Sequence, residues 1–435
     1  MSGWEVRVSQ RELHRMHVVE LTLEGRESVN RGAKFLGISA RQLKRLRRKV
    51  RERGLKGLLH GNRGKRPWNT MSQETREKVI QLVRRHYQGL NDTHLTEKLN
   101  EKEKLKLSRS SVRRILRRAG ILAVRKRGVR RHYKRRERKA QAGALLLWDG
   151  SPHHWFGEEK AEWTLTAVMD DATGMFLVGV FSAQEDAQSY LICLRQILLD
   201  YGIPGAIYMD CHGIFRRNDD HWTLEEELAG ERTPTQVGQA LRALGIEPIF
   251  ALSPQAKGRI ERLFGTLQGR LVQELRLARI TTPEKANVFL NGWFKADFNR
   301  RFSKSPKEIQ AAWRSVSRGL DLDRVCSFHY EATVANDNAV RLGGMILDIP
   351  PGPRREGYAK KRVEVCQLLD GRWRVYYQNK LLLETSPPPI PVPLRTLRRR
   401  YRKAQNEQKT KSQPPDQKND RRITLISHDF GVGAS

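Results

Sequence analysis

The sequence has little of what membrane proteins and secreted proteins need. Its longest apolar run, residues 142–148, covers seven residues, whereas a membrane-spanning helix needs about 20. The N-terminal segment has no apolar stretch of the kind that a secretory signal requires. The four cysteines, Cys193, Cys211, Cys326 and Cys366, are far apart and form no CxxC pair. We therefore expect no transmembrane segment, no disulfide framework, no cysteine-rich zinc site and a cytoplasmic location.

Acidic residues are also scarce relative to basic ones. The 435 residues, enough for about three domains, hold 82 Lys and Arg against 48 Asp and Glu, a net charge of +34. Residues 1–140 carry 41 basic and 13 acidic side chains, residues 141–310 carry 18 and 22, and residues 311–435 carry 23 and 13. Because such an excess indicates a polyanionic partner, we expect basic arms that bind nucleic acid around a centre with another role.

Residues 10–58 are predicted to form a helix–turn–helix domain. Their apolar residues recur at helical spacing, Gly37 suits the turn, and Ser39 can cap the helix that follows. That helix has a basic face opposite its apolar stripe, which suits the DNA major groove. The alternative is a solvated helical hairpin. The candidate DNA contacts on this face are Arg41, Lys44, Arg45 and Arg48.

A linker rich in Gly, Pro and Arg, residues 59–71, leads to a second predicted helix–turn–helix domain at 72–122. Its last helix, SRSSVRRILRRAG, places Arg113, Arg114 and Arg117 opposite the apolar residues. A basic linker at 123–141 follows, with Arg130 and Arg131 among its many charges. Like charges this dense predict an arm that becomes ordered on phosphates, and a disordered spacer in the absence of DNA.

The composition changes at residue 142, where a predicted α/β domain spanning 142–315 begins. The expected order is a strand, a β-hairpin, a helix, a strand, a helix, a strand and a long helix, which gives a mixed sheet covered by helices. Asp149 and Asp210 end two strands, and Glu261 lies one turn into the long helix. Ligands of open α/β sheets bind at such strand ends.

Three converging carboxylates repel one another unless cations lie between them. Mg²⁺ and Mn²⁺ prefer oxygen ligands and share their coordination with phosphate oxygens. Two such ions about 3.5–4 Å apart can activate an attacking oxygen and stabilise a leaving one. Asp149, Asp210 and Glu261 are therefore candidate ligands for two divalent ions.

Four segments carry a resemblance to a known family: WDGSPHHWF at 148–156, VMDDATG at 168–174, MDCHGIF at 209–215, and SPQAKGRIERLFGTLQGRLVQELRL at 253–277. In these segments the chain resembles DDE transposases with a retroviral-integrase-type, RNase H-like core, and most of all bacterial insertion-sequence transposases of the ISNCY kind. The resemblance covers roughly residues 10–385. It implies that Asp149, Asp210 and Glu261 are the catalytic triad.

The chain departs from the pattern of many such relatives in two ways. Fifty residues separate Asp210 from Glu261, and we attribute the excess to a surface insertion at about 216–236. Gln268 stands seven residues after Glu261, where many relatives have Lys or Arg; Gln can contact DNA without a charge. The insertion also contains rival carboxylates, which we rank below Glu261: Asp219, Asp220, Glu225, Glu226, Glu227 and Glu231.

Other polar residues near the acids have open roles. Lys257 and Arg259 are candidate phosphate contacts, and a surface ion pair between Lys257 and Glu261 is an equal alternative. His153 and His154 are expected to pack in a loop on Trp155 rather than to bind metal, and His212 to approach DNA. Asp170 and Asp171 are expected only to shape the hairpin turn.

The C-terminal part is predicted to hold three segments. Residues 284–315 have a helical pattern. Residues 322–386 alternate in short runs between turn signals, which predicts a small β-barrel that binds DNA or assists assembly. Residues 387–435 are rich in Pro and basic residues and have the composition of a disordered tail.

Together these features predict a DNA transposase that acts as a dimer or higher oligomer on transposon ends, in a bacterial cytoplasm and associated with the nucleoid. It would free 3′-OH ends and join them to target DNA by two-metal transesterification, without a membrane or a small-molecule substrate. Two alternatives stay open: a helix–turn–helix regulator with an inactive core, and an RNase H-like nuclease without strand transfer.

Overall fold

The computed structural model describes residues 9–59, 62, 70–124, 136–216, 224–251, 258–342 and 344–386. The chain divides into two compact units, one of residues 1–85 and 111–120 and the other of residues 86–110 and 121–435. The tail at 387–435 and the candidates Arg130, Arg131 and Lys257 lie outside the described residues. Within the described ranges, no helix combines the length and the apolar character needed to cross a bilayer.

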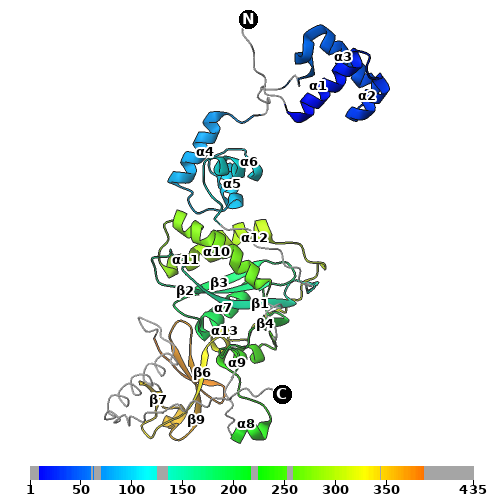
Figure 1. Ribbon diagram of the computed structural model, residues 1–435. Coiled ribbons are helices and arrows are strands. Elements are labelled where there is room, and N and C mark those ends of the chain that lie inside the picture. Colours follow the sequence, from blue (N-terminus) through cyan, green and yellow to red (C-terminus); the bar gives the residue numbers. More distant parts are fainter. Residues whose placement is uncertain are drawn as a thin grey trace, which may run out of the picture. The chain divides into compact units, whose positions relative to one another are not determined.

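The first unit begins with the expected helix–turn–helix. It consists of α1 (Gln10–Leu23), α2 (Val29–Leu36) and α3 (Ala40–Arg53), followed by the short 3₁₀ helix η1 (Gly54–Leu58) (Figure 1). Gly37 ends α2 with φ 62°, and the Ser39 hydroxyl accepts the Gln42 amide at 3.2 Å, so the predicted turn and cap are both confirmed. Gly32 lets α1 and α2 approach closely, because a Cβ there would lie 2.7 Å from Thr22.

The helices of the second predicted helix–turn–helix domain are α4 (Gln73–Arg85), α5 (Asp92–Glu101) and α6 (Arg109–Arg118). Helix α4 and most of α6 belong to the first unit, whereas α5 belongs to the second. In α6 the apolar residues Val112, Ile115 and Leu116 are buried, as their spacing predicts.

The second unit is built on a five-stranded mixed sheet. Its strands are β1 (Leu145–His153), β2 (Trp163–Asp170), β3 (Phe176–Ser182), β4 (Ala206–Met209) and β5 (Glu247–Phe250), in the order β3-β2-β1-β4-β5. Strand β2 is antiparallel to both of its neighbours, and the pairs β1–β4 and β4–β5 are parallel. The predicted α/β core is therefore confirmed.

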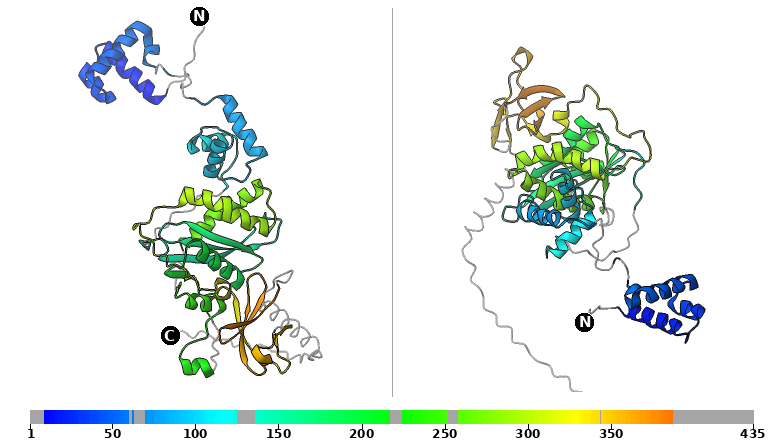
Figure 2. Two further views of the ribbon diagram at one scale, coloured as in Figure 1. Left: turned by 180° about the vertical axis from the view of Figure 1, so that it is seen from behind. Right: turned by 90° about the horizontal axis from the view of Figure 1, so that it is seen from above.

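Helices cover both faces of this sheet, as Figure 1 and the left view of Figure 2, seen from behind, both show. Helices α7 (Ala187–Asp200) and α9 (Gln236–Ala243) pack on the face that contains Leu146 and Trp148. The other face, with Leu145 and Leu147, is covered by α10 (Ile260–Leu277), α11 (Pro283–Phe289), the π-helix η3 (Leu290–Phe294) and α12 (Lys295–Phe302). A short helix of the insertion, α8, spans Leu224–Ala229.

The helical prediction for 284–315 is wrong for residues 303–315. Helix α12 ends at Phe302, and Ser303 leaves the helical region with ψ 161°. Pro306 follows three residues later; it lacks an amide hydrogen and disfavours a helical residue before it. The chain from Ser303 onward instead runs beside the core, where Ile203 and Arg314 exchange two backbone hydrogen bonds.

The C-terminal module is not a closed barrel among the described residues. After α13 (Leu322–Val325), the strands form an open sheet in the order β11-β10-β9-β6 and a separate two-stranded ribbon, β7–β8. The bounds are β6 Phe328–Thr333, β7 Ala339–Leu342, β8 Met345–Asp348, β9 Arg362–Gln367, β10 Trp373–Tyr377 and β11 Lys380–Glu384, with a 3₁₀ turn, η4, at Pro353–Arg355. The predicted β structure is correct, but the ribbon shares the apolar core of the sheet without completing its hydrogen bonding.

Candidate active site at the edge of the central sheet

Asp149 lies in β1, and Asp210 directly follows β4, the neighbouring parallel strand. Leu147 of β1 pairs with Tyr208 of β4, and each aspartate stands two residues further along its strand direction. Adjacent strands are about 4.8 Å apart, so the register brings the two carboxylates side by side. Both residues are half-buried.

The alternation of side chains places both aspartates on the face covered by α10. Leu145 and Leu147 of β1 pack in the same apolar cluster as Ile260 and Leu263 of α10. Asp149 continues this set by two residues, and Asp210 continues the equivalent set in β4, which includes Tyr208. The helix that carries the third predicted acid therefore covers the face to which both aspartates belong.

Glu261 lies along β1 between two fixed points of α10. Arg259 bonds to Asp171, whose backbone amide donates to the carbonyl of Leu145 at 3.0 Å. Gln268 donates to the hydroxyl of Ser151, two residues beyond Asp149, at 3.3 Å. Since Glu261 and Gln268 are seven residues apart, they lie on one flank of the helix. Glu261 is exposed on that flank.

A fourth carboxylate that the sequence interpretation missed stands at this edge. Glu185 follows β3, which runs parallel to β1, and accepts a hydrogen bond from the hydroxyl of Tyr190. A Cβ built on Gly150 would lie 2.8 Å from its carboxyl carbon, so the Glu185 carboxylate lies directly over the residue that follows Asp149. The strand-end position that marked Asp210 also marks Glu185, but its neighbour Asp186, which caps α7, has the same signal.

Several negative charges lie close together here, and they affect the pKa of Tyr190. Burial, then Glu185, and then the charges of Asp149 and Asp210 raise the pKa of this phenol well above its ordinary value. The donor set is made of carboxylate oxygens, which fits Mg²⁺ or Mn²⁺. The ligand atoms of Asp149, Asp210 and Glu261 do not all lie within 4.8 Å of one another among the described residues. The structure therefore brings the acids to one face without closing them into a compact ligand set.

The candidate DNA contacts have different surroundings. Arg41, Lys44, Arg45 and Arg48 are exposed on α3, and Arg113 and Arg114 are exposed on α6, whereas Arg117 is half-buried. Arg259 instead has a side chain that is only 12% exposed and forms an ion pair with the buried Asp171. This internal pairing gives Arg259 a structural partner that its basic character alone did not predict.

The neighbouring histidines and two of the rival acids have structural contacts. His153 packs edge-on against the buried Trp155, with 5.2 Å between ring centroids, and His154 contacts the Lys160 carbonyl at 2.9 Å. The His212 amide donates to Asp210 at 3.0 Å. In the insertion, Glu226 is buried and accepts the Thr233 amide, and Glu231 pairs with Arg242, whereas Asp219 and Asp220 lie outside the described residues.

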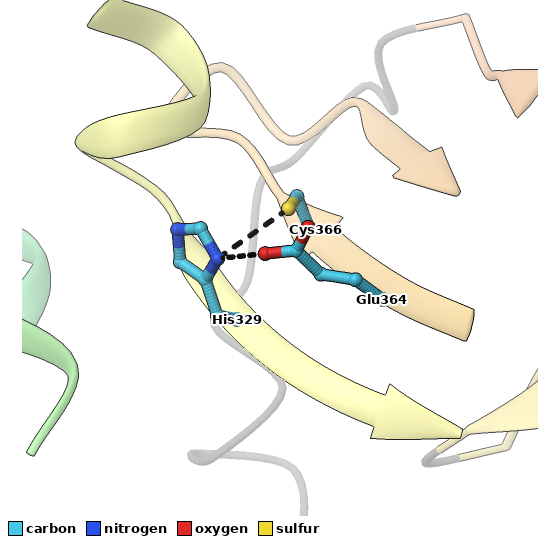
Figure 3. Close-up of side chains that lie close together, drawn as sticks. All are labelled: His329, Glu364 and Cys366. Carbon is cyan, nitrogen blue, oxygen red and sulfur yellow. Dashed lines mark hydrogen bonds and ion pairs between the residues drawn. The ribbon is translucent and has the colours of Figure 1, made fainter. Parts of the chain in front are cut away.

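Only one described group of three His, Cys, Asp or Glu side chains has its ligand atoms within 4.8 Å of one another, and it lies elsewhere: His329, Glu364 and Cys366 (Figure 3). They stand on the adjacent strands β6 and β9. His329 Nδ1 bonds to Glu364 at 2.6 Å, its Nε2 donates to the Arg324 carbonyl at 2.8 Å, and the Arg324 guanidinium also binds Glu364. A protonated imidazole and a guanidinium thus already balance this carboxylate, and we assign no metal here.

Comparison with known proteins identifies the family of the chain. A helix-turn-helix domain family matches residues 14–67, which include α2 and α3. A putative transposase, y4bF, of Sinorhizobium fredii is 34% identical over 316 residues, covering 73% of this chain and 67% of the relative. The transposase for insertion sequence IS1202 of Streptococcus pneumoniae is 32% identical over 409 residues, covering 84% and 85%. The fold and the first match define a protein with a helix–turn–helix region and an α/β core. The two relatives specify it further: the chain belongs to the family of insertion-sequence transposases.

Solved structures with some similarity include two of viral origin. The simian T-cell lymphotropic virus intasome in complex with a PP2A regulatory subunit is 12% identical, with a TM-score of 0.29, covering 71% of this chain and all of that one. The HTLV-2 integrase catalytic core domain with magnesium is 15% identical, with a TM-score of 0.23, covering 35% and 88%. Scores this low do not establish a common fold.

Proposed function

We propose that the protein is a DNA transposase that binds the terminal repeats of its element through the N-terminal helix–turn–helix region and cuts and joins DNA at the acidic edge of the central sheet. Membership of the transposase family supports the overall activity. The observation that supports the site is the register of β1 and β4, which aligns Asp149 with Asp210 on the face covered by α10.

The proposed reaction has two steps at one site. Water attacks a phosphodiester at the transposon end, the bond to the bridging 3′ oxygen breaks, and a free 3′-OH results. That 3′-OH then attacks a phosphodiester of the target, a new bond forms, and the target's own 3′ oxygen leaves. Neither step needs a covalent bond between protein and DNA.

Asp149, Asp210 and Glu261 would hold the divalent cations, two in our proposal. When bound, these ions supply Lewis-acid activation of the attacking oxygen and charge stabilisation of the leaving oxygen. The protein's own contribution would be orientation: the pairing of β1 with β4 would align the two aspartates that follow the paired residues, and the packed helix α10 would place the glutamate. The two ends of the transposon must be held in one complex, so we propose a dimer or higher oligomer on nucleoid DNA.

The first prediction tests the three acids. Asp149→Asn, Asp210→Asn and Glu261→Gln should each lower end cleavage and strand transfer by roughly 10³-fold or more, because metal-held charge stabilisation is worth several kcal/mol of barrier. Binding of end DNA should stay near wild type. Cleavage and joining of labelled end duplexes with Mg²⁺ and Mn²⁺, beside a binding assay, measure both effects.

Glu231→Gln is the matched control, since this insertion carboxylate is exposed and pairs only with the equally exposed Arg242 among the described residues. It should leave all activities unchanged. Wild-type strand transfer by Glu261→Gln would refute the third acid. A wild-type protein that binds ends without cutting them would favour the regulator, and one that cuts without joining would favour the nuclease.

A further inference from the structure

A buried aspartate joins three segments of the second unit beside the candidate site. Asp171 lies in the turn between β2 and β3, and its side chain has no exposed surface. Its carboxylate accepts from the Arg136 guanidinium at 2.6 Å, from the Lys139 amide at 2.8 Å and from the Arg259 guanidinium. The end of the basic linker, the hairpin turn and the start of α10 therefore meet at one side chain.

The contacts form a closed arrangement rather than three separate pairs. The second amino group of Arg259 donates to the carbonyl of Arg136, so the linker is bonded to both partners of the ion pair. Arg138 adds hydrogen bonds to the carbonyls of Asp171 and Ala172, at 3.0 and 3.2 Å. A buried charge is tolerated when hydrogen-bonding and oppositely charged partners surround it, as two guanidinium groups and a backbone amide do here.

Turn formation does not require this carboxylate, because the preceding residue already shapes the turn. Asp170 accepts from the Gly143 amide at 2.9 Å, and from the amide and hydroxyl of Thr173 at 2.8 and 2.6 Å. Asp171 makes no such contact within the turn. Its role is directed outward, toward the linker and α10.

The start of α10 needs an external anchor. Arg259 occupies the N-cap position, and among the described residues no side-chain hydrogen bond caps the helix there. Ile260, which is 1% exposed, fixes the next residue in the apolar core. Glu261 comes directly after it, so the two residues that precede this acid carry the contacts that set its position.

We propose that Asp171 and Arg259 are positioning residues that fix Glu261, and that they tie its placement to the end of the basic linker at Arg136. The proposal rests on the proposed role of Glu261. In this proposal Arg259 does not contact DNA. Its guanidinium instead positions Glu261 by holding the start of α10. If the linker becomes ordered on DNA, it would reinforce the contact between Asp171, Arg259 and Arg136.

The test uses the full-length protein with Asp171→Asn and Arg259→Lys. Both should lower single-turnover cleavage by about 10–100-fold, because a displacement on the order of 1 Å at a reacting group costs about that much. Both should also raise the Mg²⁺ concentration for half-maximal cleavage. Amide hydrogen exchange in residues 260–266 should become faster, while the affinity for end DNA stays unchanged.

Glu97→Gln is the matched control. It breaks the bidentate pair between Glu97 and Arg270, which holds the same helix nine residues beyond Glu261. This variant should lose thermal stability while keeping the wild-type Mg²⁺ requirement.

A milder variant, Arg136→Ala, removes only the contact that the linker makes through the Arg136 side chain, which is 41% exposed. It should fold normally and show a smaller shift of the Mg²⁺ requirement in the same direction.

Three outcomes would overturn the proposal: an unchanged Mg²⁺ requirement in folded Asp171→Asn and Arg136→Ala proteins, unchanged exchange in residues 260–266, or a loss of end binding by Arg259→Lys that accounts for its lost cleavage. Failure of the proposed function is distinguishable, because it would appear as an active Glu261→Gln protein, while hydrogen exchange still reports whether Asp171 holds the start of α10.

Discussion

At the scale of single residues, His329 shows how the C-terminal module handles charge. Burial lowers the pKa of His329, but hydrogen bonds with Cys366 and Glu364 outweigh it and raise the pKa to about 10. The hydrogen bond from His329, opposed by burial and aided by Arg324, lowers the pKa of Glu364 to about 2. Gln236 of the core bonds to both the amide and the carbonyl of His329, so this charged pair stands at the junction of core and module.

The sign of these shifts predicts a stability profile. A raised histidine pKa means that the stabilisation is complete below the unfolded value of about 6.5 and is lost as the pH rises toward 10. His329→Asn should lower the free energy of unfolding by about 2 kcal/mol at pH 6, the size of a hydrogen bond to a charged group. The difference from wild type should shrink steadily between pH 6.5 and 10 in chemical unfolding experiments.

Glu364 predicts a second change in stability, at acidic pH. The lowered pKa of Glu364 means that its stabilisation is present above the ordinary value of 4.5 and lost as the pH falls toward 2. His154→Asn is the control, because its ring contacts a loop carbonyl and is exposed. A gap between wild type and His329→Asn that stays constant from pH 6 to 10 would refute the charged pair.

At the scale of elements, α5 is fastened to α10 by buried charges rather than by apolar packing alone. Glu274 accepts Lys98 Nζ at 2.7 Å and contacts His94 Nε2 at 2.6 Å, and each of these side chains is at most 8% exposed. Burial raises the pKa of Glu274, but these two hydrogen bonds outweigh it, and the net pKa is lowered. Helix α5 thus belongs rigidly to the helix that carries Glu261.

Glu274→Gln should therefore be strongly destabilising. Removing one partner leaves the Lys98 ammonium buried without its counter-charge, which costs about 3–5 kcal/mol. Urea unfolding at pH 7 measures the loss in the free energy of unfolding. The difference in this free energy between variant and wild type should narrow below pH 4.5, where the stabilisation that comes from the lowered pKa of Glu274 begins to be lost. Glu52→Gln, which removes an exposed pair with Arg48 on α3, should cost less than about 1 kcal/mol. Equal losses in the two variants would contradict the buried network.

The sequence predicted elements well where local signals were strong, and failed where long-range contacts decide. Periodicity with Gly37 and Ser39 was sufficient for the helix–turn–helix, because turn and cap are local. The strand ends indicated Asp149 and Asp210, since alternation and strand order set their edge. The partners of Asp171 lie 35 and 88 residues away, and those of Glu274 lie 176 and 180 residues away, so no local pattern marks them. The prediction of a closed barrel failed for the same reason, because closure of a sheet depends on pairing between distant strands.

At the scale of the whole molecule, the charge is distributed unevenly along the chain, and in the proposed function it separates the DNA-binding part from the catalytic part. Residues 1–140 carry 41 basic against 13 acidic side chains, whereas residues 141–310, which contain the candidate site, carry 18 against 22. An acidic edge that holds cations is compatible with DNA only if other surfaces supply the phosphate contacts. The exposed basic residues of α3 are the described surface best suited to this.

This division predicts a steep salt dependence that maps to the N-terminal part. A protein that neutralises 6–10 phosphates loses about 10³–10⁵-fold in DNA affinity when the salt concentration rises from 50 to 200 mM. Binding of transposon-end DNA by the full chain should weaken on that scale. Arg45→Ala on α3 should reduce the slope of log affinity against log salt by about 1, the contribution of one phosphate contact. Arg242→Ala, an exposed arginine of the core, should leave the slope unchanged. If both arginines changed the slope equally, the core would grip DNA as the arms do, and the acidic edge would have to bind cations within a surface that also binds phosphates.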